Sequence, residues 1–174
     1  MENLSPAAST PVPSHLVDAN LLRLENQFKS GANWFYWIAA LSLVNSMVQA
    51  FGGTFGFVVG LGITQVFDAV GRGAAEAGGA IGTVVRGFAF VLDLFAAGVF
   101  ALFGFLARKR MRWAFVVGMA LYALDGLLFL LVGDLLGVAF HAFALFGIFV
   151  GLRAHRALQE TGVRRGAAGV RSAA

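Results

Sequence analysis

The chain has 174 residues, of which 59% are apolar and only 13% are charged. A soluble domain carries about 25% charged residues, so this composition excludes an ordinary water-soluble globule, and the surplus apolar surface points to lipid as the solvent. The sequence contains no cysteine, which excludes a disulfide framework, a thiolate metal site and a cysteine nucleophile.

The N-terminal segment, residues 1–31, precedes the first long apolar run and lacks the apolar stretch of a cleavable signal peptide. We therefore expect that first run to be an uncleaved membrane anchor. Apolar residues recur at helical spacing from Val17 to Phe28, which predicts an amphipathic helix over residues 15–29. Such a helix either lies on the membrane surface or packs against the rest of the protein.

The first predicted membrane span covers residues 32–51. A span needs about 20 predominantly apolar residues, and this run has that length. It begins with Trp34, Tyr36 and Trp37, which are typical of the aromatic belt at headgroup level.

The next segment, residues 52–87, is ambiguous. Its apolar part is short and rich in glycine, which weakens a long regular helix. A polar stripe at helical spacing follows: Gln65, Asp68, Arg72 and Glu76. Residues 53–70 are therefore predicted to form an interfacial helix, a re-entrant segment or an extra span.

Three further apolar runs have the length of membrane spans: residues 88–107, 113–132 and 135–152. A basic loop, residues 108–112, separates the first two runs. Gly133 and Asp134 form a tight connection between the last two, which predicts a helical hairpin. Residues 153–174 form a basic tail.

The positive charges predict the orientation of these spans, because cytoplasmic segments of membrane proteins carry the excess of Lys and Arg. With four spans, both termini are cytoplasmic and only Arg72 and Arg86 of the 13 positive residues lie outside. With five spans, the N-terminus moves outside and takes Arg23 and Lys29 with it. The charge distribution therefore favours four spans.

The fold class predicted from these patterns is all-α: a polytopic transmembrane helical bundle of four spans, or five, with an amphipathic N-terminal helix. We expect a cytoplasmic N-terminal tail over residues 1–31, the bundle over residues 32–152 and a cytoplasmic basic tail over residues 153–174.

The few polar residues within the spans are the candidate functional groups, because polar side chains in hydrocarbon are costly and normally face the bundle interior. Asp125 and His141 each lie eight residues from Gly133, which places both roughly 12 Å from the outer turn. Asp93 lies roughly 8 Å deep from the same side. We expect six residues to meet in one polar cavity that opens outward: Asn45, Gln49, Asp93, Tyr122, Asp125 and His141.

This candidate cluster has several interpretations. The first is a set of interhelical hydrogen bonds that fixes the register of the helices. The second is a proton or ion relay that uses the carboxylates and a titrating histidine. The third is a divalent-metal site, since two carboxylates and one imidazole are adequate ligands. Binding of an unknown substrate is the fourth.

Small residues predict where the helices approach one another closely. Gly147 and Gly151 form a G-x-x-x-G pattern, which is typical of close packing between membrane helices. The residues expected to pack helices together are Ala97, Ala101, Gly118, Gly147 and Gly151.

Known enzyme motifs are missing from the sequence, which contains no H-E-x-x-H, G-x-S-x-G or Walker A pattern. We therefore expect no catalytic activity and no cofactor. The arginine clusters flank apolar runs, so we expect them to contact lipid headgroups and not nucleic acid. The expected partners are the lipid bilayer and either further copies of the chain or another membrane protein.

Two stretches carry a resemblance: NWFYWIAALSLVNS at residues 33–46 and YALDGLLFLLVGDLLGVAFHAFALFGIFVGLRA at residues 122–154. They resemble an uncharacterised class of small bacterial inner-membrane proteins with no assigned activity. The resemblance implies a multi-pass protein of the bacterial inner membrane, and the charge distribution places its C-terminus in the cytoplasm.

The function expected from the sequence is that of a non-catalytic scaffold or subunit of a membrane assembly, which binds partners through its small-residue faces. The alternative is a small ion- or proton-coupled transporter or channel that uses the Asp/His cluster. An intramembrane enzyme is a weaker third expectation.

Overall fold

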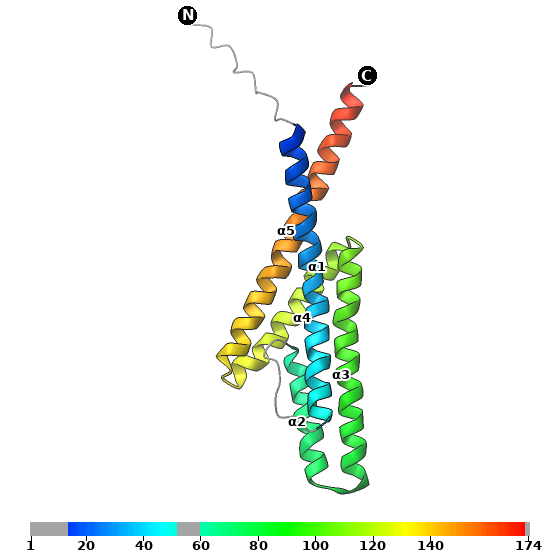
Figure 1. The fold of residues 1–174 in the computed structure, drawn as a ribbon, viewed down its shortest axis with the longest axis vertical. Helices are drawn as coiled ribbons and strands as arrows, with labels where there is room; N and C mark the ends of the chain where they lie inside the picture. The colour runs from blue at the N-terminus through cyan, green and yellow to red at the C-terminus, as the bar shows by residue number, and fades with distance from the viewer. Residues whose placement is uncertain (1–13, 52–59, 173–174) are drawn as a thin grey trace, which may run out of the picture.

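The computed structural model describes residues 14–51 and 60–172, with side chains over residues 17–51 and 60–163. The first part of the predicted N-terminal tail, residues 1–13, and the first part of the ambiguous segment, residues 52–59, lie outside this part of the chain. The described residues form five helices: α1 (Ser14–Ala50), α2 (Gly62–Glu76), α3 (Gly79–Arg108), α4 (Arg112–Leu131) and α5 (Leu135–Ser172) (Figure 1). The all-α prediction is confirmed.

Three helices in the described residues are long and apolar enough to cross a membrane: α3, α4 and residues 135–163 of α5. They contain the three apolar runs that the sequence predicts as spans. The 37-residue α1 does not belong to this set, because its second half carries Ser42, Asn45, Ser46 and Gln49. The length and composition of the three apolar helices support a membrane protein.

The long helices alternate in direction. α1 runs down in Figure 1, α3 returns beside it, α4 runs down again and α5 returns. α1 contacts both α3 and α5, and the short α2 packs mainly on α3. We call the end that holds the α3–α4 turn and the first half of α1 the basic end, and the end that holds the α2–α3 turn the opposite end.

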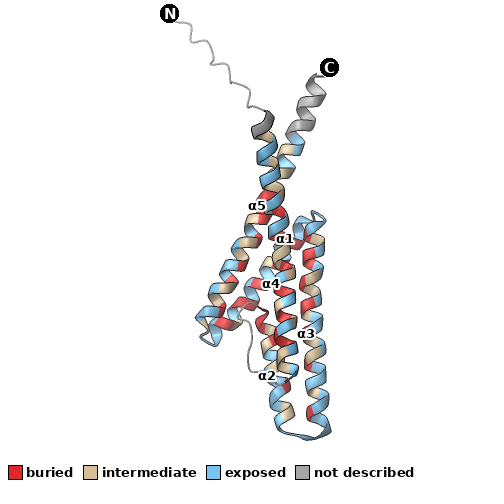
Figure 2. Cartoon of the chain, in the orientation of Figure 1, coloured by how far each residue is buried: buried red, intermediate tan, exposed pale blue. Residues whose placement is uncertain are grey.

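Much of the helix surface that faces outward is exposed (Figure 2), and apolar residues make up a large part of it. Large apolar side chains cover the outside of the bundle, as the 71% exposure of Phe95 and the 65% exposure of Phe146 illustrate. The buried residues include Asn45, Asp93 and His141, each exposed by 2% or less. Lipid is the solvent that suits such an exterior, and polar groups that face inward are expected inside a membrane.

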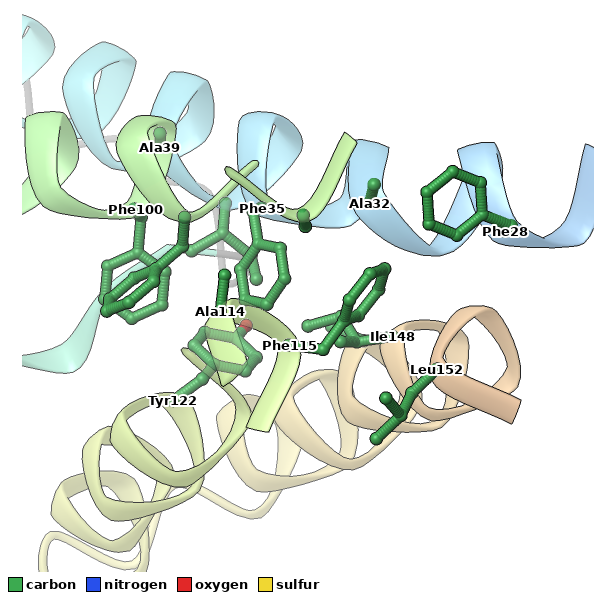
Figure 3. Close-up of a cluster of buried hydrophobic side chains, with 14 of the residues drawn as sticks. Phe28, Ala32, Phe35, Ala39, Phe100, Ala114, Phe115, Tyr122, Ile148 and Leu152 are labelled. Carbon is green, nitrogen blue, oxygen red and sulfur yellow. The ribbon is translucent and has the colours of Figure 1, made fainter. Parts of the chain in front are cut away.

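An aromatic core joins α1 to α3 and α4. The ring of Phe35 lies 6.4 Å from that of Phe100, 6.2 Å from Phe103 and 6.1 Å from Phe115. Phe100 also contacts Tyr122 edge to face at 5.9 Å (Figure 3). These separations are typical of attractive aromatic pairs, so Phe35 is the central contact of the core.

The predicted amphipathic segment, residues 15–29, is the first part of α1 and not a separate helix. Phe28 is buried, and its ring lies 6.0 Å from Phe115 and 5.5 Å from His155. Leu24 also packs against the core. The apolar side of this segment therefore packs on α4 and α5.

The closest backbone approach lies between α1 and α5. A Cβ atom on Gly151 would lie 2.6 Å from the Cα of Gly31, so only glycine fits there. The indole of Trp34 lies directly over Gly147. The G-x-x-x-G pattern of α5 thus contacts α1 of the same chain.

The other small residues of the predicted packing set also face the interior of the chain. A Cβ atom on Gly118 would lie 2.5 Å from the ring of Phe35. Ala97 is buried and Ala101 is half-buried against the same core. These faces are used to pack helices within one molecule.

Glycines in the left-handed region reverse the chain at its tight turns. Gly78 and Gly79 have φ of 80° and 76° between α2 and α3, and Gly133 has φ of 75° between α4 and α5. Asp134 then caps α5, because its Oδ1 accepts the amide hydrogen of Gly137 at 3.0 Å.

Candidate functional site

The first turn of α2 lies inside the bundle and is capped by side chains of other helices. The amide of Leu61 donates to Ser42 Oγ at 2.7 Å. The amides of Gly62 and Ile63 donate to the two carboxylate oxygens of Asp125 at 2.7 and 2.9 Å. The first amides of a helix have no partner within it, so α1 and α4 supply the acceptors that allow this helix to begin in a buried place.

From this buried start, α2 runs to the opposite end of the bundle, where it turns into α3 (Figure 1). α1 also ends there, and the Arg86 guanidinium donates to the carbonyls of Gln49 and Ala50 in its last turn. α2 therefore begins at the depth of Ser42 and Asp125, although the elements before and after it meet at the opposite end. Residues 60–70 of the ambiguous segment belong to this inserted helix and the residues just before it.

The first polar cluster surrounds Asp125. Asp125 Oδ2 lies 3.0 Å from Nε2 of His141, and the Nδ1 of that ring lies 2.9 Å from the carbonyl oxygen of Gly137. The rings of Tyr122 and Phe129 lie 4.3 and 4.7 Å from the imidazole, with Tyr122 stacked on it. Asp125 and His141 are both buried. This cluster joins α2, α4 and α5.

The second polar cluster contains two carboxyl groups. Asp93 on α3 is 1% exposed, and within the described residues no N–H group donates to either of its oxygens. Its carboxyl group faces the carboxyl group of Asp68 on α2 and the hydroxyl of Ser46 on α1. The hydroxyl of Ser46 donates to Asp68 Oδ2 at 3.3 Å. Two carboxylates that face each other in a partly buried place repel when both are ionised, so this arrangement favours a proton on one of them.

A small pocket leads from Asp68 towards the opposite end of the bundle. Its polar lining includes Gln49, Arg72 and Arg86, and the apolar remainder is Ala50, Gly71, Ala89 and Phe90. The Oε1 atom of Gln49 is buried and has no hydrogen-bond partner among the described residues. Asn45 lies deeper on α1, with its amide nitrogen beside the backbone of Gly60.

The six polar residues expected in one cavity are thus divided between two places. Tyr122, Asp125 and His141 gather around the first turn of α2, whereas Asp93 pairs with Asp68. Asn45 and Gln49 lie on α1, beside Gly60 and in the small pocket respectively. The physical reason is α2, which contacts α1, α3 and α4 and so occupies space that the sequence analysis left empty.

The divalent-metal interpretation requires three or more ligand side chains around one point. Over the residues that the structure describes, no group of three or more His, Asp or Glu side chains converges on a common point. Of the three residues proposed as metal ligands, Asp125 and His141 are in contact in the first cluster, whereas Asp93 lies in the second. The divalent-metal interpretation therefore has no geometric support.

A third group of polar contacts lies at the basic end, in the α3–α4 turn. The guanidinium of Arg110 donates to both oxygens of Glu25 at 3.0 and 2.8 Å. The carbonyl oxygen of Arg110 lies 2.9 Å from Nε2 of the buried His155. The Nδ1 of His155 is buried without a partner among the described residues. Since a carbonyl only accepts, His155 carries its hydrogen on Nε2.

The sequence analysis did not identify Asp68 and Ser42 as site residues. Asp68 belongs to the polar stripe of the ambiguous segment, and Ser42 lies on the polar face of the first predicted span. Both residues belong to patterns that the sequence shows. Their hydrogen-bond partners, however, depend on the depth to which α2 enters the bundle, and no local sequence pattern specifies that depth.

Comparisons of the chain with protein-family models, with curated proteins and with solved structures find no match. The geometry of the two clusters is therefore the basis for a functional argument.

Proposed function

We propose that the chain crosses the membrane four times, through α1, α3, α4 and α5, and that α2 is a re-entrant helix that enters from the outer side. The alternating directions of the four long helices support this topology. All positive residues except Arg72 and Arg86 belong to segments at the basic end, which makes that end cytoplasmic by the positive-inside rule. Together with the resemblance to small bacterial proteins, this favours the bacterial inner membrane, with both termini in the cytoplasm.

Cysteine accessibility tests the topology directly, because the natural chain has no cysteine. Glu76→Cys places a thiol at the exposed end of α2, and Glu160→Cys places one on α5 beyond the basic end. A membrane-impermeant maleimide added to intact cells should label the first variant and leave the second unlabelled until the cells are opened. The reverse pattern would contradict the proposed orientation.

We propose that the protein is a small transporter that carries protons themselves across the membrane, with the pair Asp68–Asp93 as its proton-binding group. The observation that carries this proposal is the placement of Asp93, which is buried and whose carboxyl group faces a second carboxyl group, that of Asp68. A proton bound by the two carboxyl groups removes the repulsion between their like charges, and Arg72 lies on the Asp68 side of the pair. Ionisable groups within membrane proteins commonly mark proton pathways.

The surroundings of the pair provide a route for the proton from the outer side. Asp68 is half-buried and borders the small pocket, whereas Asp93 lies behind it. Arg72 lies close enough to Asp68 to attract its negative charge. A proton that enters the pocket would therefore reach Asp68 first and pass to Asp93 across their contact.

The small-residue faces on which the scaffold hypothesis rests are occupied by contacts within the chain. Gly151 contacts Gly31, Gly147 contacts Trp34 and Gly118 contacts Phe35, all within one chain. A second molecule would have to displace these contacts to use the same faces. The remaining exposed faces are apolar and suit lipid.

Infrared spectroscopy and proton flux together test the transporter proposal. In membranes, the protein should show the carbonyl band of a protonated carboxylic acid that responds to the outer pH, and Asp93→Asn should remove it. Vesicles containing the protein should take up protons faster than empty vesicles under a pH gradient. Asp93→Asn and Asp68→Asn should reduce uptake to the level of empty vesicles.

The matched control is Glu76→Gln, which neutralises an exposed carboxylate on the same helix as Asp68 and should preserve both signals. Absence of the protonated-acid band in the natural protein would refute proton binding at the pair. If the band responds to pH but the vesicles take up protons no faster than empty ones, proton transport is refuted. The pair would then be a structural contact only.

A further inference from the structure

His141 has an oxygen acceptor facing each of its two ring nitrogens. We propose that His141 is an imidazolium ion that forms a buried ion pair with Asp125, and that this pair is a second proton-binding site that holds the first turn of α2 in place. The site is separate from Asp68–Asp93 and does not depend on whether the protein transports protons.

The hydrogen on Nδ1 follows from its neighbour. Nδ1 lies 2.9 Å from the carbonyl oxygen of Gly137, four residues earlier in α5. A backbone carbonyl has no hydrogen to donate, so Nδ1 must carry one. A neutral imidazole with a hydrogen on Nδ1 has only a lone pair on Nε2.

The second hydrogen follows from the contact between Nε2 and Asp125. The two atoms lie 3.0 Å apart, which is a hydrogen-bond distance. A lone pair on Nε2 against a carboxylate oxygen would be repulsive, so one proton must lie between them. The pair thus holds one proton more than a neutral imidazole and a carboxylate would hold together.

The surroundings decide which partner carries this proton. Both oxygens of Asp125 accept amide hydrogens, from Gly62 and Ile63, at the positive end of the α2 dipole. Such contacts stabilise the ionised form of a carboxyl group. The imidazole in turn contacts the aromatic rings of Tyr122 and Phe129, and aromatic faces attract cations. Both effects favour an imidazolium paired with a carboxylate.

No other charged group contacts the imidazole in the structure as described. From α4 the titratable groups that face it are Asp125 and Tyr122, and the Tyr122 hydroxyl has no hydrogen-bond partner there. The neighbouring turn of α2 contributes amide groups to Asp125, and α5 contributes the carbonyl of Gly137. The carboxylate of Asp125 is therefore the counter-ion.

The ion pair also explains why α2 can begin inside the bundle. The carboxylate of Asp125 accepts the two amide hydrogens of α2 on one side and contacts His141 on the other. If His141 lost its proton, the lone pair of Nε2 would repel the carboxylate that caps α2. The state of this one proton is thus linked to the position of the first turn of the re-entrant helix.

Nitrogen NMR of the full-length, histidine-labelled protein in lipid tests the proposal. We expect both ring nitrogens of His141 to resonate as protonated nitrogens at neutral pH, each coupled to a hydrogen. His155 is the internal control and should show one protonated nitrogen and one bare nitrogen. A His15→Gln variant removes the third histidine and simplifies the assignment. A bare Nε2 on His141 would overturn the proposal.

A second variant keeps the test independent of folding defects. In Asp125→Asn, the side-chain amide can still accept one α2 amide hydrogen and can donate to Nε2, so His141 should become neutral with a bare Nε2 signal. In an Ile63→Cys reporter, maleimide labelling of the first turn of α2 should be slow, and adding Asp125→Asn should accelerate it. An unchanged Nε2 signal in Asp125→Asn, or unchanged labelling, would contradict the link between the proton and α2.

Discussion

The two buried histidines of this protein lie in opposite hydrogen-bonding surroundings. At the basic end, His155 has one nitrogen against the carbonyl of Arg110 and the other against no polar partner among the described residues. Near the start of α2, His141 has an oxygen acceptor on each nitrogen. Both rings are buried and both contact aromatic side chains. The comparison teaches that the acceptors around a buried histidine, and not its burial alone, decide how many protons it carries.

The contrast extends to the two regions as a whole. The basic end holds its charges at the surface, where the ion pair between Arg110 and Glu25 remains half-exposed. The polar core near α2 instead buries Asp93 and Asp125. Water can replace a lost partner at the basic end, whereas nothing replaces one in the core. Equivalent substitutions should therefore cost far more in the core.

The largest effect is expected from Asp125→Ala. This change leaves the Nε2 atom of His141 and two α2 amides without their partner, and removing one member of a buried ion pair costs on the order of 3–5 kcal/mol. Thermal unfolding in detergent measures the loss. Asp134→Ala is the control, because Asp134 caps α5 at a partly exposed position and its loss should cost about 1 kcal/mol. Equal losses in the two variants would contradict the contrast.

Where α1 and α5 cross, we expect a substitution to reduce stability through overpacking and not through the loss of a polar partner. Gly151→Leu forces side-chain atoms against the backbone of Gly31, and overpacking costs about 1–3 kcal/mol or more. Gly98→Leu is the control, since no atom lies within 4 Å of the position that its Cβ would take. Unfolding in detergent should show the difference while the oligomeric state stays unchanged. A change in oligomeric state without loss of stability would instead support an intermolecular role for this face.

Exchanging each histidine for leucine sharpens the comparison further. His155→Leu removes one hydrogen bond and should cost about 1 kcal/mol. His141→Leu leaves the carboxylate of Asp125 buried without its counter-ion and should cost on the order of 2 kcal/mol more. Unfolding by denaturant in mixed micelles measures both. If His155→Leu proved the more damaging change, the assignment of the two proton states would be wrong.

The smallest effect is expected from Glu25→Gln. The pair with Arg110 is half-exposed, and such ion pairs contribute about 0–1 kcal/mol. The difference from the natural protein should shrink further at high salt because salt screens exposed charges. A stability loss that persisted in about 1 M salt would show that the basic end depends on its charges as the core does.

The helices that span the bundle could be predicted because their signals are local. Apolar runs of membrane length are bounded by the basic loop at residues 108–112 and by the turn at Gly133 and Asp134. α3, α4 and α5 contain the three predicted runs accordingly. Both long terminal helices continue beyond the apolar runs, and in α1 this extension includes Phe28, which packs on α4 and α5.

The polar core was only partly predictable. Asp125 and His141 lie at equal distances from Gly133, and in the structure they are in contact. The pairing of Asp93 with Asp68 could not be inferred, because it depends on the depth to which α2 enters the bundle. That depth is fixed by Ser42 and Asp125, which lie outside α2, so no pattern within α2 specifies it.

The cap on α2 has a consequence for the order in which the protein is made. Asp125 follows its hydrogen-bond partner Gly62 by 63 residues along the chain, and a ribosome that adds about 5–20 residues per second takes roughly 3 to 13 s to synthesise them. During that interval, the amides of Gly62 and Ile63 lack the carboxylate that accepts their hydrogen bonds, so water is the acceptor open to them. We therefore expect α2 to dock late in biogenesis, after α4 has been made.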